Sequence, residues 1–228
     1  MDAIGLNLAG VLPIGVYDLA VAESWSSQQL LPTARSAIVI GAGGTTLSHS
    51  YRTAAQRGSL DSFVAQFVAA GCARMRSIGW ESCAFGYHAL QGGQHVDLIA
   101  LAERAGLGAT SQLGLLLHPQ YGPWLSLRAL VLTERRWAAA PEADEFSPCE
   151  GCAAPCTKAC PVEAPRALPT GFDIGACGAH RALEGPCQLR CAARRACVVG
   201  PEHAYDLDAE EAHMAASLSE ILARTKIT

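Results

Sequence analysis

The sequence has very little lysine and no long uninterrupted apolar stretch. Lys158 and Lys226 are the only lysines among 228 residues, and the net charge is −4. Because nucleic-acid-binding surfaces are built from clustered Lys and Arg, this composition argues against a nucleic-acid partner. Short apolar runs, interrupted by Gly, Ser or charged residues, predict no membrane span and no membrane partner.

The amino-terminal stretch lacks the basic segment that opens a secretory signal peptide. Its first twenty residues are moderately apolar, and Asp2 has the wrong charge for such a segment. This predicts a cytoplasmic protein. Internal repeats and low-complexity tracts are also absent, and 50% of the residues are hydrophobic, which is enough for a sizeable core.

Cysteine, by contrast, is abundant and unevenly distributed. Of ten cysteines, only Cys72 and Cys83 lie in the first 148 residues, and the other eight lie between Cys149 and Cys197. Disulfides are rare in a reducing cytoplasm, where clustered cysteines usually bind metal. The small, acidic segment AAAPEADEFSP at 138–148 precedes the cysteines and is typical of a linker. We therefore expect two domains, 1–140 and 141–228.

The spacing of the eight cysteines favours iron–sulfur clusters. In a familiar ferredoxin run, three cysteines bind one cubane cluster and a fourth, followed by Pro, binds the other. This chain has the same run with one residue inserted before the third cysteine, and Pro161 follows the fourth. By that rule the first four-iron four-sulfur cluster would be bound by Cys149, Cys152, Cys156 and Cys197. The second would be bound by Cys160, Cys177, Cys187 and Cys191.

Two other uses of these cysteines stay open. Two zinc sites with four thiolates each would also require eight cysteines, but zinc sites favour paired CxxC motifs, and Cys149–Cys152 is the only one here. Disulfides are the third alternative. Arg190, Arg194, Arg195 and Lys158 lie among the cysteines and would either offset cluster charge or be ordinary solvated charges.

The remaining pattern predicts a mixed α+β protein. Residues 36–40, SAIVI, are expected to form a buried strand that ends at a Gly-rich turn. Apolar residues at helical spacing predict helices over 60–78 and 95–106, and a terminal helix over 206–226 that Asp208 and Glu211 would cap. The segment 113–134 predicts two strands joined by HPQYGP, the second with alternating faces.

A few residues outside the cysteines are candidates for cofactor chemistry. Gly41, Gly43 and Gly44 follow the first strand and resemble a dinucleotide fingerprint, but Thr46 occupies the third glycine position. We favour a tight turn there, whose amides would still be able to hold the polar part of a cofactor. His118 and Tyr121 are candidate proton donors; the alternative is a polar loop packed on Trp124.

Beyond these patterns, the stretch AERAGLGATSQLGLLLHPQYGPWLSLRALVLTE and the Cys-Pro run resemble the epoxyqueuosine reductase and reductive dehalogenase group of iron–sulfur proteins. The resemblance implies a nitroreductase-like α/β domain, a ferredoxin-like module with two four-iron four-sulfur clusters, and a C-terminal helix. It also implies cobalamin as the cofactor, with flavin as the alternative. Leu113 and His118 would then contact the cofactor.

The chain departs from that group at the catalytic carboxylate. No equivalent of the group's proton-donating Asp is found, and the nearest carboxylate, Asp97, is expected at the surface of a helix. We expect a redox enzyme that receives electrons from a ferredoxin, flavodoxin or flavin reductase and passes them through the clusters to a cofactor or substrate. The alternative is a non-catalytic electron carrier or corrinoid-handling protein that serves a partner enzyme.

Overall fold

The chain folds into two compact units. The computed structural model describes residues 4–55, 58–86, 96–138, 146–168, 171–183 and 185–225, with side chains to 218. The first unit comprises Met1–Gly108 and Leu125–Phe146, and the second comprises Ala109–Trp124 and Ser147–Thr228. In this division residues 109–124 group with the cysteine-rich part of the chain, and the later boundary falls between Phe146 and Ser147; the expected domains, 1–140 and 141–228, stay a prediction.

The first unit is built on a four-stranded antiparallel sheet. Its strands are β1 (Leu8–Pro13), β2 (Ser36–Gly43), β3 (Ser82–Gly86) and β6 (Leu125–Thr133), in the order β1-β2-β6-β3. The expected turn after residue 40 is wrong in its position. Strand β2 stays paired with β6 as far as Gly43, with a register shift between Ile40 and Gly41. The chain leaves the strand at Gly44, which has φ +72°.

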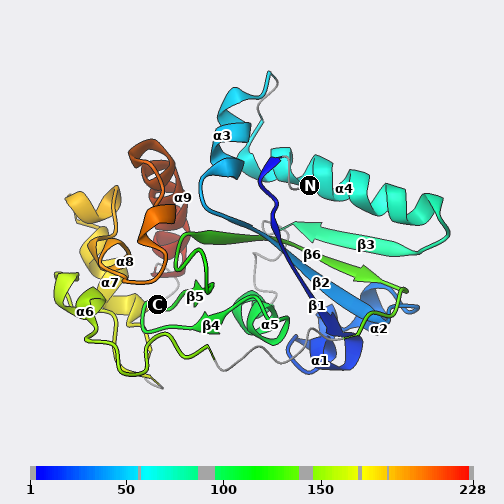
Figure 1. Cartoon of the computed structure of the whole chain (residues 1–228), viewed down its shortest axis with the longest axis horizontal. Coiled ribbons are helices and arrows are strands. Elements are labelled where there is room, and N and C mark those ends of the chain that lie inside the picture. Colours follow the sequence, from blue (N-terminus) through cyan, green and yellow to red (C-terminus); the bar gives the residue numbers. More distant parts are fainter. Residues whose placement is uncertain are drawn as a thin grey trace. The chain divides into compact units, whose positions relative to one another are not determined.

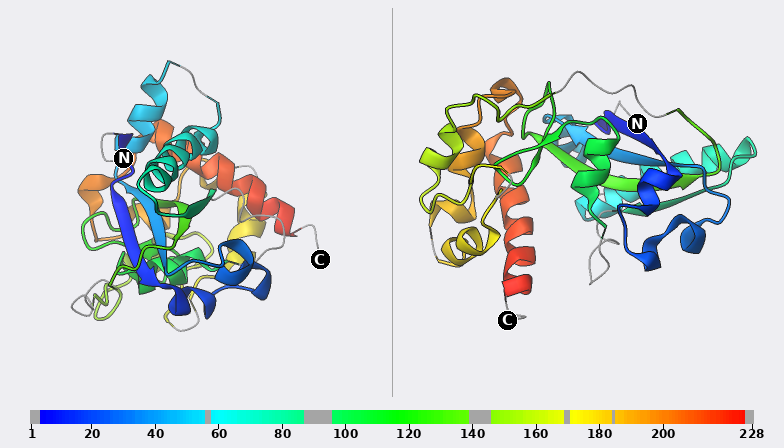
Figure 2. Two further views of the ribbon diagram at one scale, coloured as in Figure 1. Left: turned by 90° about the vertical axis from the view of Figure 1, so that its right-hand side faces the viewer. Right: turned by 90° about the horizontal axis from the view of Figure 1, so that it is seen from below.

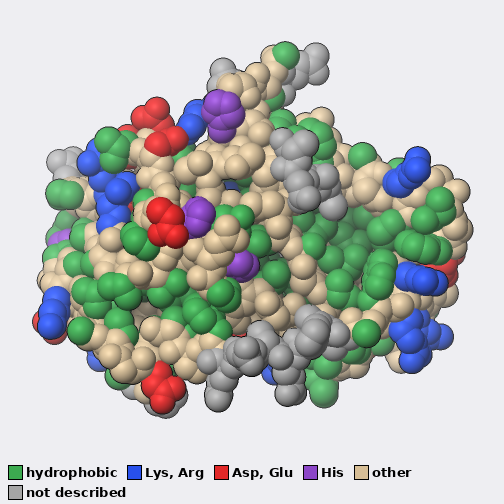
Figure 3. All heavy atoms as spheres, viewed as in Figure 1, with side chains coloured by type: hydrophobic (Ala, Val, Ile, Leu, Met, Phe, Trp, Pro, Cys, Tyr) green, Lys and Arg blue, Asp and Glu red, His purple; other side chains and the backbone are tan. Residues whose placement is uncertain are grey.

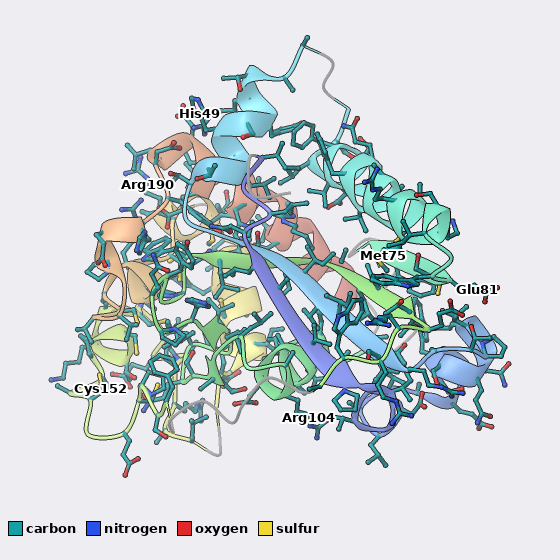
Figure 4. The ribbon with its side chains drawn as sticks, turned by 45° about the vertical axis from the view of Figure 1, so that its right-hand side comes forward. His49, Met75, Glu81, Arg104, Cys152 and Arg190 are labelled. Atoms are coloured by element: carbon teal, nitrogen blue, oxygen red, sulfur yellow. The ribbon has the colours of Figure 1, made fainter. Side chains whose placement is uncertain are left out.

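Helix α4 (Leu60–Ser77) covers one face of this sheet, as the apolar spacing predicts (Figure 1). Phe63, Val64, Val68 and Cys72 pack with Ile40, Ala42, Ala129 and Val131 in one buried cluster. Ser59 caps the helix by accepting a hydrogen bond from the Ser62 N–H at 3.1 Å. Met75 and Glu81 lie near the turn from α4 into β3 (Figure 4).

The opposite face is covered by α5 (Leu98–Arg104), which contacts β1, β2 and β6 (Figure 1). Leu101 and Ala102 of this helix are fully buried, as are Leu130 and Leu132 of β6. Burial along β6 therefore does not alternate as expected: residues 126–128 are all partly buried, and residues 129–133 are all buried because both faces are covered there. The remaining elements of this unit are α1 (Ile14–Asp18), η2 (Glu23–Trp25), α2 (Ser27–Leu30) and α3 (Thr46–Thr53).

The second unit consists of short elements around its cysteines. They are β4 (Ala109–Thr110), β5 (Leu116–Leu117), α6 (Pro155–Ala159), α7 (Ile174–Arg181), η4 (Pro186–Gln188), α8 (Ala192–Arg195) and η5 (Pro201–His203). The longest element is the terminal helix α9 (Leu207–Thr225), which contacts α7 and η4 (Figure 2). The α+β class and this terminal helix are confirmed.

The start of α9 differs from the expected capping box. Asp206, rather than Asp208 or Glu211, accepts the hydrogen bond from the Ala209 N–H at 2.8 Å. None of the helices in the described part of the chain is long and apolar enough to cross a bilayer.

Candidate metal centre

All eight clustered cysteines belong to the second unit. Cys149 and Cys152 lie on the loop before α6, where Figure 4 labels Cys152; Cys156 lies within α6 and Cys160 at its carboxyl end. The other four lie in or beside short helices: Cys177 in α7, Cys187 in η4, and Cys191 and Cys197 at the two ends of α8. All ten cysteines of the chain are free, so the disulfide alternative is not seen.

Four of the cysteines line a common hollow. Its walls include Cys149, Cys152, Cys156 and Cys197. Leu113, a candidate cofactor contact, also lines it, together with Ser111, Gln112, Leu117, Pro148, Pro155, Val198 and Val199. The structure therefore brings Cys197 to the first three cysteines across forty residues of sequence.

The thiols of this set influence one another electrostatically. Burial raises the pKa of Cys156 and of Cys197, and the thiolate charges of Cys149 and Cys152 raise both further. Cys156 itself adds to the effect on Cys197. Four ionised sulfurs in one place are unfavourable without a cation, and a bound metal or metal cluster would supply the opposing charge.

The other four cysteines form a second electrostatic group. Burial raises the pKa of Cys177, Cys187 and Cys191, and the thiolate charge of Cys160 contributes in all three. Cys187 and Cys191 also raise the pKa of Cys177. Each of these pKa shifts is influenced by cysteines of the same expected set; the assignment of the two ligand sets stays a prediction.

Backbone amides already point at two of these sulfurs. The Ala164 N–H donates to Cys160 Sγ at 3.4 Å, and the Arg194 N–H donates to Cys191 Sγ at 3.4 Å. Hydrogen bonds of this kind stabilise thiolates and tune the potential of a cluster that they bind. Cys191 also occupies the amino-terminal cap of α8, where the helix dipole favours a negative charge.

Two arginines of this unit are buried rather than solvated. Arg194, only 4% exposed, donates to the carbonyl of Pro123 and lies 4.9 Å from the ring centre of Trp124 and 4.8 Å from that of Tyr205. Arg181 donates to the carbonyls of Cys187 at 3.1 Å and Met214 at 2.7 Å. Burial places both positive charges in the interior of the unit that holds the thiols.

The other basic side chains stay at the surface or are paired there. Lys158 is exposed, and Arg190 pairs with Glu211 at 3.3 Å (Figure 4). Basic and acidic side chains intermingle on the face of the molecule that Figure 3 shows. No extended basic surface is seen there.

His118 forms a tight turn with Tyr121 and Gly122. The backbones of His118 and Gly122 bond to each other, and His118 Nδ1 accepts the N–H groups of Gln120 at 3.0 Å and Tyr121 at 3.3 Å. Burial, and secondarily the charge of His203, lower the pKa of His118. With Nδ1 accepting, the neutral ring carries its proton on Nε2. A role for His118 or Tyr121 as proton donor stays a prediction.

This turn meets the loop after Cys197 at two glycines. Gly122 has φ +54°, and a Cβ there would lie 1.9 Å from the Val199 carbonyl oxygen; Gly200, with φ +60°, would place one 2.6 Å from the Gln120 oxygen. The ring of His203 packs edge-on against Tyr121, with centroids 4.8 Å apart. Only glycine permits so close an approach of two backbones.

The candidate glycines at 41–44 lie in the first unit. The carboxamide of Asn7 both accepts the Gly43 N–H at 2.8 Å and donates to the Gly43 carbonyl at 3.2 Å. A Cβ on Gly41 would lie 3.0 Å from the Ser126 oxygen, so packing within the sheet accounts for this glycine. Contact of Gly41, Gly43 and Gly44 with a cofactor stays a prediction.

Asp97, the carboxylate nearest to the expected catalytic position, caps a helix. Its side chain is exposed and accepts the Ala100 N–H at 2.9 Å at the start of α5. Part of the segment compared with the catalytic region, residues 87–95, lies outside the described residues. Of the remaining cysteines, Cys72 is a core residue, as expected, and Cys83 is half-buried in β3.

Sequence reasoning missed an ion pair whose acidic member is buried. Glu210 in α9 is 0% exposed and pairs with Arg195, whose side chain is 36% exposed. A signal for it exists in the sequence, because Glu210 precedes Met214 by four residues and so falls on the apolar stripe of the helix. A charged residue on such a stripe requires an oppositely charged partner.

Within the described residues, no group of three or more His, Cys, Asp or Glu side chains is placed to hold a single metal ion. The choice between iron–sulfur clusters and zinc stays a prediction.

Comparison with known proteins finds solved structures with a similar fold. No protein-family model matches the chain, and no curated protein matches it either. Among solved structures, epoxyqueuosine reductase from Streptococcus thermophilus aligns with a TM-score of 0.56 and 14% identity, over 87% of this chain and 64% of that protein. The Bacillus subtilis epoxyqueuosine reductase aligns with a TM-score of 0.59 and 16% identity, over 92% of this chain and 66% of that protein.

Reductive dehalogenases are also similar. One, described in connection with B12-dependent dehalogenation, aligns with a TM-score of 0.57 and 18% identity, over 98% of this chain and 34% of that protein. The chain thus spans about two thirds of the epoxyqueuosine reductases and one third of the dehalogenase. The similarity in fold to these two kinds of reductase is confirmed, as the sequence resemblance predicted.

Proposed function

We propose that this protein is an iron–sulfur redox protein that binds two four-iron four-sulfur clusters. The observation that supports the proposal is that eight free cysteines lie in one unit and that their thiols influence one another within each expected set of four. Cys149, Cys152, Cys156 and Cys197 would bind one cluster, and Cys160, Cys177, Cys187 and Cys191 the other. When bound, such clusters supply one-electron transfer.

The chain's own residues suit this role. Backbone N–H groups at Cys160 and Cys191 orient the thiolates, and the buried guanidinium groups of Arg181 and Arg194 offset their negative charge. These features support an electron-transfer centre rather than a purely structural one.

The favoured electron acceptor is a cofactor bound by the first unit, with cobalamin ahead of flavin, or a substrate bound there. Support for cobalamin comes from the fold, since one structural neighbour is described as a B12-dependent dehalogenase. The proposed electron donor is a ferredoxin, flavodoxin or flavin reductase.

The second candidate is a non-catalytic electron carrier or corrinoid-handling protein. One observation favours it: the side chain of Asp97 is engaged as a helix cap rather than held free as a proton donor. Anaerobic purification with and without added cobalamin tests the corrinoid part of both candidates: an unchanged cobalamin spectrum would leave only a carrier that binds no corrinoid, whereas a changed spectrum would fit an enzyme or a corrinoid-handling protein.

The clusters themselves are tested by iron and sulfide analysis. We expect about eight irons and eight sulfides per chain, the content of two cubanes. Cys156→Ala and Cys197→Ala should each lower iron to about four, and the double variant should lose no more, because both ligands serve one cluster. Cys156→Ala with Cys160→Ala should lose both clusters. Cys72→Ala is the matched control.

A different pattern would contradict the proposal. Bound zinc without iron would discard the redox function. If the Cys156→Ala, Cys197→Ala double variant lost all iron while the single variants lost half, the ligand sets would be wrong.

A further inference from the structure

Glu210 is a completely buried carboxylate that is hydrogen-bonded to a member of the second cysteine set. Its Oε1 accepts the backbone N–H of Cys191 at 3.2 Å. Its Oε2 accepts Arg195 Nε at 2.6 Å and also contacts a terminal nitrogen of Arg195. A buried carboxylate is destabilising unless it is paired and hydrogen-bonded. These contacts therefore stabilise the charge of Glu210 in the interior.

Arg195, the last residue of α8, pairs with this carboxylate. It also donates to the Tyr205 carbonyl at 3.3 Å and lies 5.8 Å from the ring centre of Trp124. One carboxylate therefore joins α9, the last turn of α8 and the peptide of Cys191. The same cysteine receives the Arg194 N–H on its sulfur, so its backbone and side chain are both fixed.

We propose that Glu210 and Arg195 are positioning residues for the second set, and that their charge balance sets the reduction potential of the cluster bound there. The inference rests on the proposed function. Reduction adds one negative charge to a cluster, so a nearby anion opposes it and a nearby cation favours it. Paired, the two charges nearly cancel. Removal of Arg195 leaves the fully buried carboxylate of Glu210 uncompensated, whereas removal of Glu210 leaves a guanidinium whose side chain is 36% exposed.

An exposed pair of the same composition provides a matched control. Glu211 follows Glu210 in α9, and Arg190 precedes Cys191, so this pair joins the same two segments. Its side chains are 38% and 47% exposed, and the nitrogen and oxygen are 3.3 Å apart. Water and salt screen such a pair, so its loss should change the potential much less.

The experiment is a potentiometric titration of the holoprotein with a chemical reductant, followed by electron paramagnetic resonance. The second cluster is recognised as the signal that Cys160→Ala removes. Glu210→Gln keeps an oxygen for the Cys191 N–H but loses the charge, so the potential should rise. Arg195→Gln should lower it, the double variant should return towards the parent, and Glu211→Gln should shift it least.

Arg195→Lys keeps the positive charge and should keep a potential near that of the parent, even if either charge-removing variant loses its cluster. Three results would each overturn this inference and leave the proposed function standing. They are potential shifts of Glu210→Gln and Arg195→Gln in the same direction, a potential shift of Glu211→Gln as large as that of Glu210→Gln, and loss of the cluster in Arg195→Lys. A parent protein without iron would overturn the proposed function together with it.

Discussion

At the scale of single residues, two glycines determine how closely the 118–122 turn approaches the loop after Cys197. The backbones cross where Gly122 faces Val199 and Gly200 faces Gln120. Because Cys197 is the only member of the first set that follows Cys160 in sequence, its position depends on this crossing rather than on local spacing.

We predict that Gly122→Ala disrupts the first set. A left-handed backbone costs an alanine about 1–2 kcal/mol, and its Cβ would also overlap the Val199 carbonyl. The expected result is a lower free energy of unfolding in urea and loss of iron from the first set, with the second cluster's signal retained. Gly185→Ala is the control, since nothing lies within 4 Å of a Cβ there. Full iron content in Gly122→Ala would contradict this reading.

A second prediction concerns Cys83. Burial, and then the charge of Cys72, raise its pKa from 9.0 to about 11. Below pH 9 this thiol stays protonated in both folded and unfolded chains; between pH 9 and about 11 only the unfolded form ionises, so ionisation there favours unfolding. At pH 8, alkylation of folded Cys83 should be about 100-fold slower than of an ordinary thiol.

Mass-spectrometric mapping of the Cys83 peptide, with and without urea, measures this. The rate in the folded protein should increase with pH up to about 11, whereas the rate in urea should level off near pH 9. Equal rates at pH 8 would show that the thiol is not shielded.

At the scale of elements, hydrophobic periodicity predicted the long helices well and the short elements poorly. The pattern from Leu60 to Ile78 gives α4 within one residue of its observed end, because an apolar stripe against a sheet is a local property of sequence. The end of β2 was misplaced, because its pairing with β6 through Gly43 is set by a partner over eighty residues away. The second unit shows little hydrophobic periodicity. The cysteine spacing was therefore more informative there than the secondary-structure propensity of its residues.

Asp97 provides a prediction at this scale. If it serves α5 as a cap, Asp97→Asn should leave the free energy of unfolding of the first unit unchanged, because Asn caps as well as Asp. Asp97→Ala should lower that free energy by about 1 kcal/mol. Urea unfolding monitored by circular dichroism measures both. Equal losses in the two variants would mean that the carboxylate charge, and not the cap, is what matters.

At the scale of the whole molecule, the two units differ in what holds them together. The first has a sheet covered on both faces by apolar side chains. The second relies on short helices, buried arginines and its cysteines. The sequence indicated this contrast through its cysteine distribution, but it did not reveal that residues 109–124 fold with the cysteines, because their apolar pattern suits a sheet strand equally well.

We predict that iron removal loosens the second unit selectively. When an anaerobic sample is treated with a chelator and oxidant, hydrogen exchange should speed up in α6, α7 and α8, because metal binding contributes to the folding free energy of such a unit. Exchange in β2, β6 and α4 should change little. Equally rapid exchange in both units would show that the first one also needs the metal.

If the two cysteine sets are interleaved as proposed, the order of synthesis has a consequence for biogenesis. The second set has all four thiols once residue 191 has left the ribosome, whereas the first, although three of its members are made earlier, must wait for Cys197. The set that starts later in the chain is therefore complete sooner. Iron delivered during translation would at first find four cysteine ligands only in the second set.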